Sequence, residues 1–144
     1  MRHSNHGRRG VLVALALWAL AGMMSAAAQD PRVSAAQAAA RDWLVLTDAG
    51  NAGGSYAAAG AKYRSALTAE QWAGALASAR TPFGPVVQRT FATGQTGKPQ
   101  GAPDGEYAVV VFRTAFEKKS DTAETLTMER EPDGQWRVIG YSIR

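Results

Sequence analysis

The amino-acid sequence predicts an α+β fold in which N-terminal helices pack on a curved antiparallel sheet of about four strands. Apolar residues recur at helical spacing through residues 33–80, and from Val86 onward they alternate at the two-residue period of a strand. The segment Thr81–Pro85, which holds two prolines and a glycine, separates the two regions. Helices followed by a run of strands typically form a layer on one face of an antiparallel sheet.

The first 28 residues are predicted to be a signal peptide. Arginines at positions 2, 8 and 9 precede an uncharged apolar stretch, Val11–Met24, and the small residues that follow fit a cleavage site after Ala28. The alternative is an uncleaved segment that anchors the protein in the inner membrane, because the uncharged run from Gly10 to Gln29 is just long enough to span a bilayer. Cleavage is the favoured interpretation, since alanine and glycine dilute the stretch.

Removal of this segment changes the composition. The predicted mature chain, residues 29–144, is one domain that keeps 13 of the 16 basic residues and all 12 acidic ones, a net charge of +1. Both histidines, His3 and His6, lie in the signal segment, and the chain has no cysteine. This composition excludes imidazole and thiol catalysis, and it predicts no metal, cofactor or nucleic-acid partner. Export without cysteine favours a bacterial periplasm, with no stable membrane anchor after cleavage.

Three helices are predicted between residues 33 and 80. In a capping box, an N-cap serine or threonine and a glutamine three residues later bond to each other's backbone amides. Proline cannot continue a helix and marks an end. The predicted starts are Ser34 with Gln37, Ser55, and Thr68 with Gln71, and the predicted ends are Asp48–Asn51 for the first helix and Thr81–Pro85 for the third.

Four strands are predicted after residue 85. They are rich in β-branched and aromatic residues, and turn residues separate them. The predicted strands are Val86–Thr93, Glu106–Lys118, Ala123–Glu131 and Gln135–Ile143, with a glycine- and proline-rich loop at Gly94–Gly105.

The segment Tyr107–Phe112 is apolar at both alternating sets of positions. A sheet that is covered on one side alone has polar residues on the other side. We therefore expect both faces of this strand to be shielded. Three interpretations remain open: the sheet curves around a small cavity, its outer face meets another subunit, or the strand is simply central.

A set of motifs lies along residues 36–144. The motifs are Trp43-Leu44, Asp48-x-Gly50, Ser55, Gln71-Trp72, Arg80-x-Pro82-x-Gly84, Arg89, Pro103–Tyr107, Phe116, Glu124-Thr125, Asp133-Gly134-x-Trp136-Arg137-Val138 and Gly140-Tyr141. This set resembles the bacterial domain-of-unknown-function 4019 family (DUF4019), which implies no established activity and no catalytic residue. The order of elements also resembles the cone-shaped nuclear transport factor 2-like fold, which is related in shape to cystatin-like folds and serves enzymes, ligand binders and dimerisation modules.

Two acidic residues are candidates for chemistry. Glu106 stands where the loop enters a strongly apolar strand, and a structural ion pair with Arg89 or Arg80 is favoured over catalysis. Asp48 stands at the end of the first helix, where the helix dipole disfavours a carboxylate. A structural hydrogen bond from a donor is therefore the favoured role for Asp48.

These observations favour a non-enzymatic exported module that binds a periplasmic protein or forms a homodimer through its sheet. The alternative is a binder of a small apolar molecule on the concave face of the sheet. A carboxylate-based isomerase or dehydratase ranks third, and no catalytic residue is predicted. The ligand-binding candidates are Arg89, Glu106, Tyr107, Trp136 and Tyr141.

Overall fold

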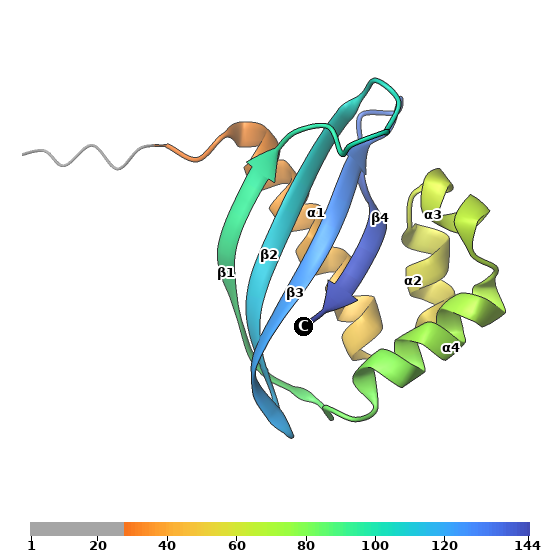
Figure 1. Cartoon of the computed structure of the whole chain (residues 1–144), viewed down its shortest axis with the longest axis vertical. Coiled ribbons are helices and arrows are strands. Elements are labelled where there is room, and N and C mark those ends of the chain that lie inside the picture. Colours follow the sequence, from red (N-terminus) through yellow and green to blue (C-terminus); the bar gives the residue numbers. More distant parts are fainter. Residues whose placement is uncertain (1–27) are drawn as a thin grey trace, which may run out of the picture.

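The structure is a computed structural model that describes residues 28–144. The predicted signal segment lies outside the described residues, apart from Ala28. Within residues 28–144 the chain forms four helices followed by four strands, which confirms the predicted α+β class (Figure 1). No helix in this part of the chain is long and apolar enough to cross a membrane.

The first helix, α1 (Pro31–Asp48), begins three residues before its predicted cap. The carboxylate of Asp30 accepts a hydrogen bond from the backbone amide of Arg32 at 2.9 Å and caps the helix. Pro31 supports this start, because proline fits the first turn of a helix and needs no hydrogen-bond partner there. The predicted capping box at Ser34 is therefore wrong.

A break at Gly60 divides the predicted second helix into α2 (Ala52–Ala58) and α3 (Ala61–Ala66). The side chain of Asn51 caps α2 by accepting a hydrogen bond from the amide of Gly54 at 2.8 Å. The predicted cap, Ser55, is wrong, because this residue lies buried inside the helix. The break leaves the Gly60 amide to donate to the carbonyl of Val138 at 2.7 Å.

The last helix, α4 (Ala69–Arg80), has the predicted capping box. The amide of Gln71 donates to Thr68 Oγ1 at 3.1 Å, and the amide of Thr68 donates to Gln71 Oε1 at 2.8 Å. These two hydrogen bonds confirm the predicted start of the helix. The start could be predicted from the sequence because both bonds are local and need no tertiary partner.

The four strands form one open antiparallel sheet in the order β1-β2-β3-β4. β1 runs further than predicted, and β3 starts earlier because the β2–β3 turn is tight: Phe116 already pairs with Lys119. β1 shifts its pairing with β2 between Val86 and Gln88 and again between Phe91 and Thr93. The strands are β1 (Val86–Thr96), β2 (Glu106–Phe116), β3 (Lys119–Arg130) and β4 (Trp136–Ile143).

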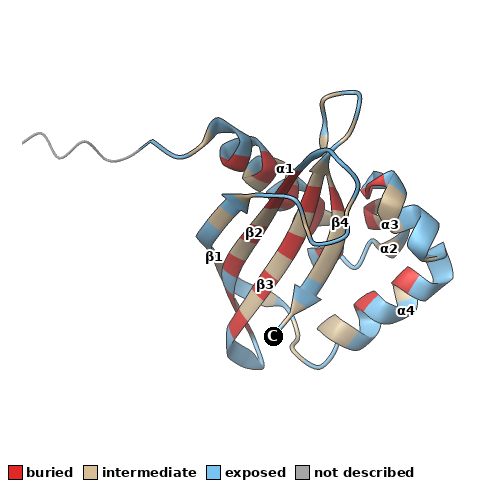
Figure 2. Cartoon of the chain, turned by 45° about the horizontal axis from the view of Figure 1, so that its top comes forward, coloured by how far each residue is buried: buried red, intermediate tan, exposed pale blue. Residues whose placement is uncertain are grey.

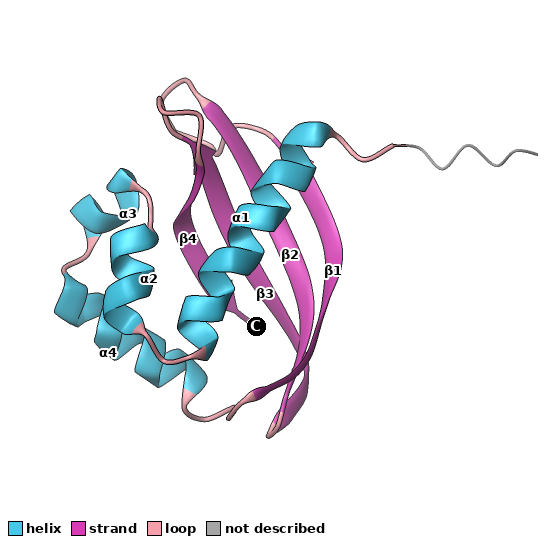
Figure 3. Ribbon diagram, turned by 180° about the vertical axis from the view of Figure 1, so that it is seen from behind, coloured by secondary structure: helices cyan, strands magenta, loops and turns pink. Residues whose placement is uncertain are grey.

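The helices cover one face of the sheet, which we call the inner face. α1 crosses this face, and α2, α3 and α4 lie beside β4 (Figure 3). Alternate residues of β2 and β3 point to the inner face and are buried (Figure 2). The core comprises Ala36, Ala40, Trp43, Leu44, Trp72, Leu76, Ala108, Val110, Phe112, Leu126, Met128 and Val138.

Candidate functional site

A carboxylate of β3, that of Glu124, is fully buried on the inner face, with 0% of its surface exposed. Arg89 Nε donates to Glu124 Oε1 at 2.7 Å, and the hydroxyl of Thr114 donates to the same oxygen at 2.5 Å. The hydroxyl of Tyr141 donates to Oε2 in a short hydrogen bond. A buried charge costs several kcal/mol unless partners satisfy it. Strands β1, β2 and β4 each supply such a partner.

Asp48, the last residue of α1, joins two arginines. Its carboxylate accepts two hydrogen bonds from Arg89, at 2.7 and 2.9 Å, and one from Arg80 Nη2 at 2.7 Å. Arg80 Nη1 lies 3.9 Å from Glu124 Oε2. The predicted structural hydrogen bond of Asp48 is confirmed. We call Asp48, Arg80, Arg89, Glu124 and Tyr141 the charge cluster.

The pKa values of Asp48, Arg89 and Tyr141 move away from neutrality. Burial opposes ionisation of Asp48, but hydrogen bonds from Arg89 and Arg80 lower its pKa below the ordinary value of 3.8. Burial likewise opposes the charge of Arg89, yet hydrogen bonds to its two carboxylate partners raise its pKa. Burial, together with the charge of Glu124, raises the pKa of Tyr141. A general base works best with a pKa near the working pH, so these shifts favour a structural cluster.

One nitrogen of the charge cluster is unsatisfied. The buried Nε of Arg80 has no hydrogen-bond partner within residues 28–144. The rest of that guanidinium also donates to Thr47 Oγ1 at 3.2 Å and lies over the ring of Phe116. Asp48 ends α1 and Arg80 ends α4, so the ion pairs of the charge cluster hold the C-terminal ends of both helices against the sheet.

Glu106 forms the predicted ion pair, but the predicted partners, Arg89 and Arg80, are wrong. Glu106 lies at the other end of the sheet, where it pairs with Arg130 Nη1 at 3.1 Å, and both side chains are 47% exposed. The two residues are direct neighbours in the β2–β3 register. Arg89 instead pairs with Glu124, because the register of β1, β2 and β3 places Glu124 closer to Arg89 than Glu106 is.

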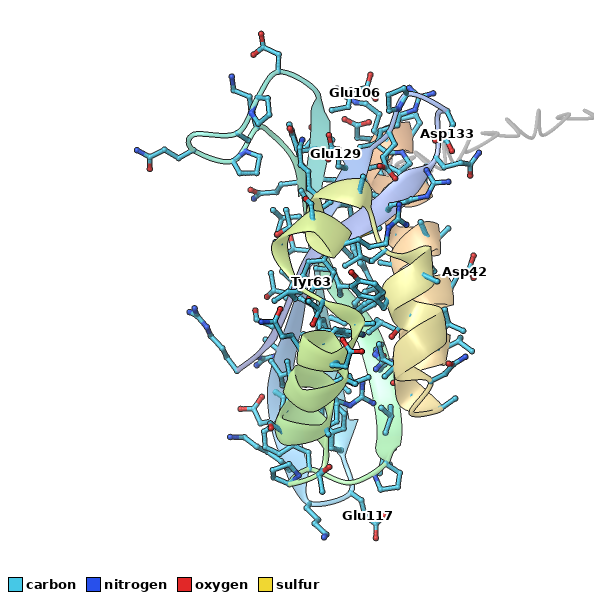
Figure 4. All side chains as sticks on the ribbon, turned by 90° about the vertical axis from the view of Figure 1, so that its right-hand side faces the viewer. Asp42, Tyr63, Glu106, Glu117, Glu129 and Asp133 are labelled. Atoms are coloured by element: carbon cyan, nitrogen blue, oxygen red, sulfur yellow. The ribbon has the colours of Figure 1, made fainter. Side chains whose placement is uncertain are left out.

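Several acidic residues gather at the end of the molecule that holds Glu106. Figure 4 shows Glu106, Glu129 and Asp133 at this end, while Glu117 lies at the opposite end. Each of the three has its own basic partner: Arg130, Lys62 and Arg137 respectively. Within the part of the chain that the structure describes, no group of three or more acidic or histidine side chains is placed to hold a metal ion.

Three aromatic residues, Trp43, Trp72 and Tyr141, pack against one another. The ring centroids of Trp43 and Trp72 lie 5.6 Å apart, and that of Tyr141 lies 5.3 Å from Trp43. Both indoles are satisfied by one residue of α2: Trp43 Nε1 donates to the carbonyl of Ser55 at 2.8 Å, and Trp72 Nε1 donates to its hydroxyl at 2.9 Å. This packing fills the space between the helices and the sheet.

Tyr107 is also buried, but it lies on the face of the sheet opposite to the inner face. Its hydroxyl donates to the carbonyl of Pro103 at 2.9 Å and accepts a hydrogen bond from Lys62 Nζ at 2.7 Å. Lys62 also pairs with Glu129 at 2.6 Å. The loop before β2 and the helix α3 thus close one end of this face.

Trp136, the remaining candidate, borders a surface hollow between α1 and the start of β4. The hollow has a volume of about 260 Å³. Trp43, Leu46 and Val138 form apolar walls, and Asp42 and Arg137 stand at the hollow as charged groups. Trp136 is therefore the candidate that remains accessible on the side of the helices, whereas Arg89 and Tyr141 are engaged in the charge cluster.

Within residues 28–144, the second face of the sheet carries no helix over its middle; this face is turned toward the viewer in Figure 1. Val109 and Val111 point to this face and are half-buried, so the expectation of shielding on both sides holds for Tyr107 but not for these two residues. Their neighbours in the register are uncharged. We call the following residues the open face: Thr93, Gln95, Val109, Val111, Thr125, Thr127, Gly140 and Ser142.

A family model described as "Protein of unknown function (DUF4019)" matches residues 39–141, which is more than half of the chain. The chain belongs to the DUF4019 family. Comparisons with curated proteins and with solved structures gave no match. The family description assigns no activity, so the site geometry carries the functional argument for this DUF4019 protein.

The sequence analysis of this DUF4019 protein missed the role of Glu124. A signal for it was present, because Glu124 has the same strand parity as Leu126 and Met128, which point into the core. An ionisable residue at a core-facing position needs a charged or hydrogen-bonding partner. The identity of that partner depends on the packing of separate strands.

Proposed function

We propose that this DUF4019 protein is an exported periplasmic module without enzymatic activity that self-associates through its open face. The observation that carries the proposal is the uncharged open face. Its eight residues come from all four strands and include no ionisable side chain. Solvated faces of antiparallel sheets are normally polar, so two half-buried valines in the middle of this face favour an apolar contact.

A second copy of the chain is the partner that fits this surface. Two identical faces that lack charge meet without like-charge repulsion, and sheets pack face to face at about 10 Å with side chains between them. The predicted mature chain has a net charge of only +1. Long-range repulsion between copies is therefore weak.

The state of the acidic residues supports a non-enzymatic role. Glu124 is held by Arg89, Thr114 and Tyr141, and Asp48 is held by two arginines. Neither carboxylate is an isolated acid in an apolar pocket, which an isomerase or dehydratase of the proposed kind would need.

Size-exclusion chromatography with light scattering, over a dilution series, tests the proposal. The wild-type mature chain is expected to show at least twice the monomer mass at high concentration. Val111→Lys places a charge in the open face and is expected to weaken association about tenfold or more. Val45→Lys is the matched control, because Val45 is 65% exposed on α1, away from the sheet. A wild-type chain that stays monomeric, or an unchanged Val111→Lys, overturns the proposal.

Export is tested separately. Intact mass and N-terminal sequencing of the protein from periplasmic and membrane fractions should show a periplasmic chain that starts at Gln29. A membrane-bound chain whose mass retains residues 1–28 would instead support the inner-membrane anchor.

A small apolar ligand is a second candidate, favoured by the hollow beside Trp136. Native mass spectrometry of protein from its own periplasm would reveal a retained molecule. Such a mass should disappear in Trp136→Ala, which removes one wall of the hollow. Retention of the molecule by this variant would place it elsewhere.

We also propose that the helix layer and sheet form a cone of the nuclear transport factor 2-like type. The element order and the single covered face support this assignment. An experimental structure that superposes poorly on such folds would refute it.

A further inference from the structure

The outer edge of β1 is the open edge of the sheet. Among the strands of residues 28–144, β1 is terminal and has β2 as its single neighbour. The opposite edge is partly occupied, because the amide of Gly60 donates to the carbonyl of Val138 in β4 at 2.7 Å. A terminal strand leaves one row of backbone groups without strand partners, which is a template for pairing with another chain.

β1 has little charge to prevent such pairing. Natural edge strands are often protected by lysine or other charged side chains. The single charged residue of β1 is Arg89, and Glu124 and Asp48 draw its guanidinium to the inner face. Val87 is 70% exposed. The outward side chains beyond it are uncharged: Gln88, Thr90, Ala92, Thr93 and Gln95.

We propose that β1 pairs in antiparallel fashion with β1 of a second copy, about a two-fold axis through Thr90. β1 pairs regularly with β2 from Gln88 to Phe91, so the axis lies within a regular run. An axis at this position sets Thr90 opposite itself, a favourable cross-strand pair. It also sets Arg89 opposite Phe91 of the second copy, so no like charges face each other.

This contact is independent of the open face. The β1 axis is perpendicular to the sheet, whereas the axis of a face-to-face dimer runs parallel to the sheet, between the two copies. Perpendicular two-fold axes that intersect close an assembly at four chains, and axes that do not intersect extend it beyond four. If both contacts form, the assembly therefore has four chains or more, and the loss of either contact leaves a dimer.

Thr90→Glu tests the β1 contact. Within one chain, the new carboxylate lies opposite Arg113, its register neighbour in β2, so the fold should be maintained. Across the axis the new carboxylate faces the same carboxylate of the second copy. The two negative charges repel, so the association constant should fall tenfold or more. The matched control is Gln100→Glu, in an exposed loop. In light scattering, Thr90→Glu should lower the wild-type mass to that of a dimer, and Thr90→Glu combined with Val111→Lys should give a monomer.

The outcomes separate the two proposals. An unchanged mass for Thr90→Glu overturns the β1 contact, whatever Val111→Lys does. An unchanged mass for Val111→Lys, with a halved mass for Thr90→Glu, overturns the open-face contact alone.

Disulfide trapping gives a second readout, because the chain has no cysteine. Residues directly opposite in an antiparallel pair have Cα atoms about 4.5–5.5 Å apart, which is within disulfide range. Thr90→Cys should therefore cross-link readily in the Val111→Lys background. Thr93→Cys, whose copies would lie roughly 20 Å apart, should not. Equal cross-linking of the two variants would overturn the proposed axis.

Discussion

Glu124 and Glu106 each form an ion pair with an arginine, but the Glu124 carboxylate is buried, whereas the Glu106 pair is exposed to solvent. Glu106 and Arg130 are about half exposed, so solvent screens their attraction. Glu124 is buried from solvent, and Arg89, Thr114 and Tyr141 donate the hydrogen bonds that its carboxylate accepts. The buried glutamate–arginine pair should therefore contribute more to folding stability than the exposed pair.

Glu124→Gln should lower the free energy of unfolding by about 3 kcal/mol or more, because it removes one of the two carboxylates that neutralise the buried charge of Arg89. Glu106→Gln is the matched control and should cost less than about 1 kcal/mol. Urea unfolding followed by circular dichroism measures both. Equal losses in the two variants would contradict the structural role of the charge cluster.

Asp48 gives the charge cluster a pH dependence. Its pKa is lower in the folded chain than its ordinary value of 3.8, so its contribution to stability is complete above that value. The contribution is lost as the pH falls through the lower pKa of the folded state. Below about pH 4, the wild type should therefore lose stability more steeply than Asp48→Asn, as measured by urea midpoints at successive pH values. Parallel pH profiles would refute this assignment.

At the scale of elements, one glycine decides where the helical region breaks. A Cβ at Gly60 would lie 2.7 Å from Ile139 Cγ2 and 3.3 Å from the carbonyl oxygen of Val138. The close approach of Gly60 to β4 is what separates α2 from α3. A helix prediction from spacing within residues 55–67 has no access to a contact with a strand about 80 residues later.

Gly60→Ala should lower the free energy of unfolding by about 1–3 kcal/mol, because Ile139 must move. Gly74→Ala makes an informative comparison. Gly74 lies inside α4, and a Cβ there meets no other atom within 4 Å. This second change should raise stability by up to about 1 kcal/mol, because alanine favours the helix. A loss of stability in both variants, in thermal or urea unfolding, would contradict this account.

At the scale of the whole molecule, the helices use one face of the sheet and leave the middle of the other uncovered within residues 28–144. The open face and the β1 edge are both uncharged, so contacts made through them should depend little on ionic strength. Raising the salt concentration from about 0.05 M to about 0.5 M shortens the Debye length severalfold. The association constant should nevertheless change less than about threefold, as measured by sedimentation equilibrium. A steep fall with salt would show that ion pairs hold the copies together.

The sequence by itself determined the α+β class, the order of helices and strands, and the capping box at Thr68. It also determined the near-neutral charge of residues 29–144 and their lack of histidine and cysteine. These properties depend on composition or on residues a few positions apart. Tertiary structure alone decided that Glu124, and not Glu106, meets Arg89, that Gly60 splits a helix, and that the open face stays uncovered. Each of these outcomes depends on strand register and layer packing, which bring together residues distant in the chain and which local periodicity does not encode.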